Sequence, residues 1–126
     1  MNVTVADYRN TWSERQFAAA VLSAAQAGGW SVSYVPDWLW SLAFKQFRQT
    51  GKVPRDWAPP GWPDLVLCRP PDDFLVVELK AAKGTVRSPQ LAWISDLRRC
   101  GIETYVWRPK DLDFIIERLS PKEVNE

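Results

Sequence analysis

Two short apolar segments separated by a turn constrain the fold of this chain more than any other feature. Residues 64–69, DLVLCR, and residues 74–80, FLVVELK, are rich in apolar and β-branched side chains, and the PPDD sequence between them favours a turn. This pattern predicts a β-hairpin. Because both strands are largely apolar, we expect them to be buried within a sheet that helices flank.

The remaining sequence predicts further elements in the order α-β-(insertion)-β-β-α-β-α. Ser13 and Gln16 have the spacing of a capping box, so a helix begins there and ends at Gly28 and Gly29. The other predicted elements are a strand over residues 30–35, a helix over residues 88–100 with Leu91, Ile94 and Leu97 facing inward, a strand over residues 102–107 and a helix over residues 111–119. A strand-helix-strand crossover implies one parallel pair, so the expected fold class is α/β with a mixed central sheet.

Composition excludes several kinds of chemistry. The chain of 126 residues has no His and only two Cys, so it holds neither a His-based nucleophile system nor a typical zinc site. Carboxylates and lysine are the groups left for catalysis. The length favours one domain over residues 1–126, and without a long apolar run we expect a cytoplasmic protein with no membrane association.

Residues 36–62 differ in composition from the rest and form an expected insertion or cap. They contain four tryptophans and a possible short helix over residues 37–51. The basic residues Lys45, Arg48, Lys52 and Arg55 stand here with no acid between them. Three readings are open: a cap that covers the sheet, a surface whose Trp38, Trp40, Trp57 and Trp62 stack on unpaired bases, or a self-association surface.

Polar residues end the otherwise apolar hairpin. Alternation along the second strand places Glu78 and Lys80 on one side, and an antiparallel partner brings Asp64 opposite the end of that strand. Two converging carboxylates form a hard oxygen site that suits Mg²⁺ or Mn²⁺, and a nearby lysine stabilises developing negative charge. The alternative is a simple ion pair between Glu78 and Lys80.

The runs GWPDLVLC and VVELKAAKGTVRSPQLAWISDLRRCGIETYVWRP closely resemble the VRR-NUC branch of the PD-(D/E)XK nuclease superfamily. The likeness covers nearly all of residues 61–119 and the helix that begins with SER. The ordered set of PD, ExK, Gly and then Gln with Trp three residues later carries it. The resemblance implies a restriction-endonuclease-like αβββαβ core.

The resemblance also implies roles for individual residues. Asp64 and Glu78 would bind the metal together with the backbone carbonyl of Leu79, and Lys80 would position the attacking water. Glu14 would complete the metal shell through water or hold a second ion, although an acid in a first helical turn is also favoured by the helix dipole. Gln90 would lie near the site, within reach of Lys80 or a phosphate, or else be an exposed first-turn residue.

Outside this core the chain departs from the resemblance. Family members have a shorter connection where this chain has its Trp-rich segment, so substrate selection is expected to differ there. Lys83 and Arg87, after the ExK motif, are candidates for phosphate contacts or for a solvated turn.

These observations predict a Mg²⁺- or Mn²⁺-dependent DNA endonuclease. Resemblance to short, phage-type members implies branched DNA, such as flaps or four-way junctions, as substrate, and a two-fold homodimer with one site for each of two strands. Such a protein would act in the host cytoplasm. A nuclease of linear DNA that serves packaging or host-DNA degradation is the open alternative. The rival functions are a catalytically inactive DNA-binding module with the nuclease fold, and a structural protein that interacts through its tryptophans.

Overall fold

A computed structural model describes residues 4–50 and 61–123 and shows a four-stranded mixed sheet between helices. The strands are β1 (Ser31–Tyr34), β2 (Leu65–Arg69), β3 (Asp73–Leu79) and β4 (Glu103–Trp107), in the spatial order β1-β2-β3-β4. β2 is antiparallel to both of its neighbours, β1 and β3, and β3 and β4 are parallel. The predicted hairpin and the predicted parallel pair are both confirmed.

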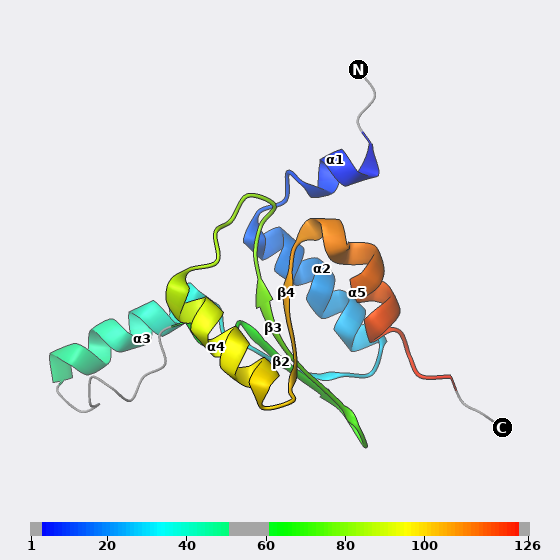
Figure 1. Ribbon diagram of the computed structural model, residues 1–126. Helices are drawn as coiled ribbons and strands as arrows, with labels where there is room; N and C mark the ends of the chain where they lie inside the picture. Colours follow the sequence, from blue (N-terminus) through cyan, green and yellow to red (C-terminus); the bar gives the residue numbers. More distant parts are fainter. Residues whose placement is uncertain (1–3, 51–60, 124–126) are drawn as a thin grey trace.

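Helices cover the two faces of this sheet (Figure 1). The helices are α1 (Val5–Arg9), α2 (Glu14–Ala27), α3 (Asp37–Thr50), α4 (Ser88–Arg99) and α5 (Leu112–Leu119), and a single 3₁₀ turn, η1 (Pro109–Asp111), precedes α5. In Figure 1, α2 and α5 lie on one side of the sheet and α4 on the other. The sequence did not predict α1, and it placed the start of α5 one residue early.

The core lies between the sheet and the pair α2 and α5. The N-terminus of α2 carries the predicted capping box, because the Ser13 and Gln16 side chains each accept a hydrogen bond from the backbone of the other residue. Inward positions of α2, the central strands and α5 are fully buried. These core residues include Phe17, Val21, Leu65, Leu67, Leu75, Val77, Trp107, Ile115 and Leu119.

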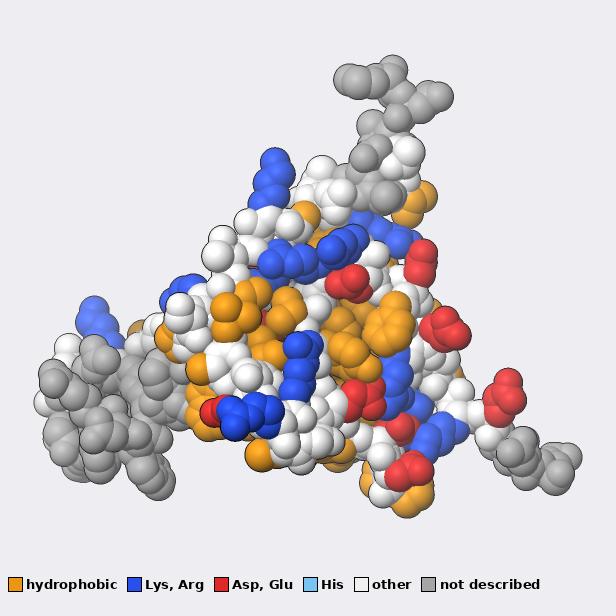
Figure 2. Space-filling view, in the orientation of Figure 1, with side chains coloured by type: hydrophobic (Ala, Val, Ile, Leu, Met, Phe, Trp, Pro, Cys, Tyr) orange, Lys and Arg blue, Asp and Glu red, His pale blue; other side chains and the backbone are white. Residues whose placement is uncertain are grey.

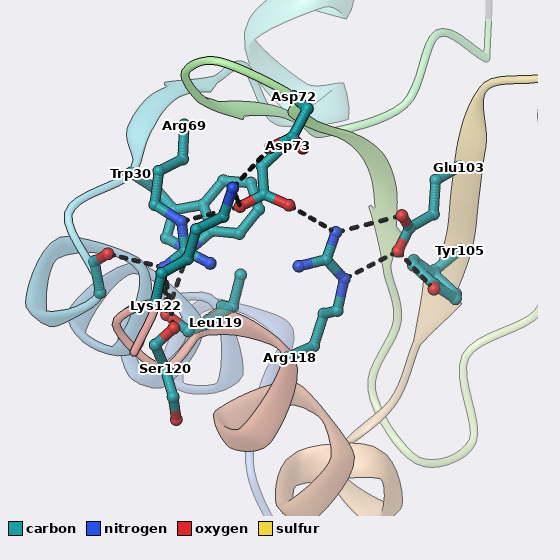
Figure 3. A network of polar contacts seen from close by, with 11 residues as sticks. Trp30, Arg69, Asp72, Asp73, Glu103, Tyr105, Arg118, Leu119, Ser120 and Lys122 are labelled. Atoms are coloured by element: carbon teal, nitrogen blue, oxygen red, sulfur yellow. Dashed lines mark hydrogen bonds and ion pairs between the residues drawn. The ribbon is translucent and has the colours of Figure 1, made fainter. Parts of the chain in front are cut away.

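A network of charged residues ties the hairpin turn to the ends of both covering helices (Figure 3). Arg69 donates hydrogen bonds to the carbonyl oxygens of Gly28 and Ser120 and lies 4.4 Å from the ring centre of Trp30. Asp73 accepts from Arg69 and from Arg118, which also pairs with Glu103. Cations at helix C-termini are electrostatically favourable, so this network fixes the sheet against α2 and α5.

The described part of the Trp-rich segment includes α3 and Trp62. Helix α3 extends away from the sheet beyond α4 (Figure 1), and Trp38, Leu39 and Leu42 on it are exposed. Nearer the sheet, the ring of Trp62 lies edge-on to Trp93 of α4, with 4.9 Å between ring centres. The three readings of the segment stay predictions, and Trp57 lies outside the described residues.

Candidate active site

Strand register brings the two predicted carboxylates together. Leu65 of β2 pairs with Val77 of β3, so Asp64, one residue earlier, stands opposite Glu78, one residue later. Cross-strand neighbours in an antiparallel pair project to the same side of the sheet. The two carboxylates are electrostatically coupled, because the charge of Asp64 raises the pKa of Glu78.

Each carboxylate is held by a specific contact. The backbone N–H of Leu79 donates to Oδ2 of Asp64 at 2.8 Å, which fixes Asp64 against β3. Oε1 of Glu78 accepts from Nε2 of Gln90 at 2.8 Å and lies 3.6 Å from Nζ of Lys80. Oε2 of Glu78 is buried and has no hydrogen-bond partner among the described residues. An oxygen of this kind is costly in the protein interior unless it binds a proton or a cation.

Burial controls the ionisation of this pair. Asp64, Glu78 and Lys80 are each less than a tenth exposed. Burial, followed by the charge of Asp64, raises the pKa of Glu78 well above its ordinary value. Burial also raises the pKa of Asp64, against the hydrogen bond from Leu79 that lowers it. The two carboxyl groups therefore favour a shared proton when no cation is bound.

Glu14 reaches the same region from the first turn of α2. Partial burial raises the pKa of Glu14, and the nearby positive charge of Lys80 acts in the opposite direction. The charge of Glu14 in turn raises the pKa of Asp64. Glu14 therefore lies near enough to Asp64 and Lys80 for their charges to interact.

The predicted orientation of α4 is wrong by one position at its start. Leu91 was expected to face inward, but its side chain is 53% exposed, and Gln90 is 1% exposed. Gln90 and Ile94 are four residues apart and both face inward. Gln90 is buried there because its amide donates a hydrogen bond to Glu78. The amide contacts Glu78 rather than Lys80, and the exposed reading of Gln90 is also wrong.

Asp37 is a residue of this site that sequence reasoning missed. It begins α3, and its Oδ2 accepts from Nε2 of Gln90 at 3.0 Å and from the guanidinium of Arg87. Its charge raises the pKa of Asp64, Glu78 and Glu14. The available signal was an acid directly after Pro36, at the point where a strand gives way to a helix.

Close backbone contact holds the chain beside this site. Gly61 has φ +87°, and a Cβ built on it would lie 2.5 Å from the carbonyl carbon of Pro89 at the start of α4. Only glycine fits such a conformation and such an approach. The segment that leads into Asp64 is therefore seated against the same helix turn that carries Gln90.

The predicted basic contacts fall into three groups. Lys83 and Lys45 are exposed, on the loop after β3 and on α3 respectively. Arg87 is engaged in its ion pair with Asp37. The side chain of Arg48 and all of Lys52 and Arg55 lie outside the described residues.

The donor set suits a hard divalent cation. Two buried carboxylates, one with an unpartnered oxygen, are oxygen ligands of the kind that Mg²⁺ and Mn²⁺ prefer. Over residues 4–50 and 61–123, no group of three or more His, Cys, Asp or Glu side chains is arranged to hold a metal ion. Any such ion therefore needs ligands beyond side chains, namely backbone carbonyl oxygens and water.

The αβββαβ order, the mixed sheet and the flanking helices define a restriction-endonuclease-like α/β fold. The VRR-NUC domain model matches residues 41–111, more than half of the chain, and this protein belongs to the VRR-NUC domain family. The match contains Asp64, Glu78, Lys80 and Gln90, whereas Glu14 and Asp37 precede it.

Family membership gives the chain a nuclease-type role in DNA processing. The corresponding comparisons with curated proteins and with solved structures found no match. Among the described residues, no helix combines the length and the apolar character needed to cross a membrane.

Proposed function

We propose that this protein is a metal-dependent endonuclease that hydrolyses phosphodiester bonds in DNA. The observation that carries the proposal is the buried Asp64 and Glu78 pair with Lys80 beside it, in which Oε2 of Glu78 has no partner among the described residues. A purely structural ion pair would satisfy both carboxylate oxygens.

In this proposal Asp64, Glu78 and the carbonyl of Leu79 hold the metal ion, and Glu14 contributes through water or at a second ion. When bound, a Mg²⁺ or Mn²⁺ ion polarises the scissile phosphate and lowers the pKa of bound water. The unpartnered oxygen of Glu78 and the hard character of the donors support this assignment.

The protein's own groups have separate tasks. The ammonium of Lys80, 3.6 Å from Glu78, orients the attacking water and offsets negative charge that develops on the phosphate. Gln90 orients Glu78 through its 2.8 Å hydrogen bond, so its role is to position a ligand rather than to contact phosphate. The in-line attack breaks the bond between phosphorus and the leaving oxygen.

The test is cleavage of labelled DNA by the purified protein in Mg²⁺ or Mn²⁺, beside the Glu78→Gln and Lys80→Ala variants. We expect metal-dependent cutting that EDTA abolishes and that each variant reduces by about a hundredfold or more. Lys122→Ala, which removes a lysine that follows α5 and pairs with Asp72 and Asp73 at the hairpin turn, is the control and keeps wild-type activity.

If the wild type and both site variants bind DNA equally and none cuts it, the rival function as a non-catalytic DNA-binding module holds. If the protein has no affinity for DNA, a structural interaction role replaces both.

We further propose branched DNA as the substrate and a two-fold homodimer as the active form. The resemblance to short VRR-NUC proteins supports this, because two sites related by a dyad act on two strands. Comparison of linear, flap and four-way junction substrates, together with the mass of the protein in solution, tests it. Equal cutting of all three DNAs by a monomer contradicts it.

A further inference from the structure

A basic hollow lies beside the candidate active site. It has a volume of about 420 Å³ and is lined by Asn10, Ala82, Lys83, Arg108 and Lys110. Because β3 and β4 are parallel and Leu79 pairs with Trp107, the chain leaves both strands at the same end of the sheet. The hollow therefore lies at the same end of the sheet as Glu78 and Lys80.

Specific contacts build the walls of this hollow. The guanidinium of Arg108 donates hydrogen bonds to the carbonyl oxygens of Ala81 at 2.8 Å and Gly84 at 2.6 Å, which fixes the loop that follows Lys80. The carboxylate of Asp111 accepts from the backbone N–H of Arg108 at 2.9 Å and so fixes the turn that carries Lys110. Arg108 therefore holds the loop after Lys80 in place as one wall of the hollow.

The α1 helix closes the same region. It packs against η1, and Arg9 pairs with Asp113 of α5 at 3.3 Å. Asn10, which follows α1, thereby reaches the lining of the hollow. Neither α1 nor Asn10 lies within the part of the chain that the family model matches.

The charges at this hollow lack the carboxylate partners that most other cations have. Lys83 and Lys110 form no ion pair with any described residue, whereas Lys80 and Arg87 are paired with Glu78 and Asp37. No acidic side chain is among the described residues that line the hollow. Figure 2 shows Lys and Arg side chains gathered at this end of the molecule, where the loop after β3 lies beside the start of α5. The described lining of the hollow therefore carries positive charge only.

We propose that this hollow binds a phosphate group of the DNA backbone, with Lys83 and Lys110 as the cations that contact it. The inference rests on the proposed nuclease function and assigns a place to the substrate strand. A phosphate held here sits on the loop that begins at Lys80, so it sets the register of the strand relative to the cleavage site. Contacts to phosphate position DNA without reading its sequence.

The test measures binding of labelled DNA by fluorescence anisotropy in EDTA, so that no cleavage occurs, over a range of salt concentrations. The proteins are the wild type, the Lys83→Ala/Lys110→Ala double variant, its charge-conserving Lys83→Arg/Lys110→Arg counterpart as the matched control, and Lys122→Ala as the loss of one charge away from the hollow. We expect the double alanine variant to bind severalfold more weakly, with a salt slope lower by about two. The arginine counterpart and Lys122→Ala should bind as the wild type does. Circular dichroism of all four proteins confirms that they are folded.

The possible outcomes test the phosphate site and the proposed nuclease function separately. Wild-type binding that the double alanine variant retains in full, with an unchanged salt slope, overturns the phosphate site while the nuclease proposal stands. A wild type that neither binds nor cuts DNA overturns the nuclease proposal itself. Inorganic phosphate is the second probe: if it raises the melting temperature of the wild type but not of the double variant, while DNA affinity is the same for both, the hollow takes free phosphate and the DNA assignment is wrong.

Discussion

At the scale of single residues, Gln90 connects three parts of the site through hydrogen bonds. Its Nε2 donates to Glu78 and to Asp37, and its Oε1 accepts from the backbone N–H of Arg87 at 2.8 Å. Every hydrogen of this amide therefore has a protein acceptor, so its orientation is fixed. Through it, the start of α3 is coupled to a carboxylate at the end of β3.

This coupling predicts different effects for two changes at Asp37. Asp37→Ala removes the acceptor for Gln90 and should lower kcat by about tenfold, because Glu78 loses part of its orientation. Asp37→Asn keeps an acceptor oxygen but removes a charge that raises the pKa of Glu78 and Asp64. Those pKa values then fall, so the acidic limb of the pH profile of kcat/KM moves to lower pH.

The measurement is cleavage rate against pH for both variants, with Asp96→Asn as control, since Asp96 is an exposed acid on α4 whose ion pair among the described residues is with Arg99. Profiles of both Asp37 variants that coincide with that of the control would show that Asp37 has no influence on the site.

At the scale of elements, the ends of α2 and α5 meet without room for a side chain. A Cβ on Gly28 would lie 1.8 Å from the carbonyl oxygen of Leu119, which is backbone and cannot move aside. Trp30 also donates to that oxygen at 3.1 Å. The absence of a side chain at residue 28 thus sets how closely the two helices approach.

We expect Gly28→Ala to lower the free energy of unfolding by about 3 kcal/mol or more, because the helices must separate. Gly101→Ala is the matched control: its φ is +80°, but a Cβ there meets nothing within 4 Å. Its cost should be only about 1 kcal/mol of backbone strain. Urea unfolding of both variants measures the difference, and equal costs would contradict the steric argument.

At the scale of the whole molecule, the site lowers stability when no cation is bound. The pKa values of Asp64 and Glu78 are raised by burial in the folded protein and ordinary in the unfolded chain. The folded state therefore holds these protons more tightly, and the stability that the two groups contribute is fully present only below their ordinary pKa values of roughly 4. Stability falls as the pH rises through the raised pKa values.

The predicted result is a melting temperature in EDTA that decreases from about pH 5 to about pH 9, apart from other titrating groups. Glu78→Gln, which cannot ionise, should be more stable than the wild type at pH 8 by about 1 to 3 kcal/mol. Mn²⁺ should raise the melting temperature of the wild type more at pH 8 than at pH 6, because binding displaces protons. Scanning calorimetry checks all three expectations, and a Glu78→Gln variant that is less stable than wild type at pH 8 would contradict them.

Most of the secondary structure could be predicted from local sequence patterns. The strands and the four main helices could be predicted because turn residues, capping spacing and apolar periodicity act over a few neighbouring residues. The meeting of Asp64 and Glu78 could also be predicted, since a short turn leaves a hairpin only one register that buries its apolar face.

What only the tertiary structure decided involves residues far apart in the chain. Nothing in the local pattern distinguishes Leu91 from Gln90 as the inward residue of α4, because the choice depends on a carboxylate lying above the helix start. The contact of Asp37 with Gln90, 53 residues away, and the hollow formed by Asn10, Lys83 and Lys110 depend on how helices and loops pack at one sheet edge. The sequence by itself determined the elements and the acids that they carry, since those depend on short-range preferences. Packing selected their neighbours, because side chains from distant segments compete for the same buried space.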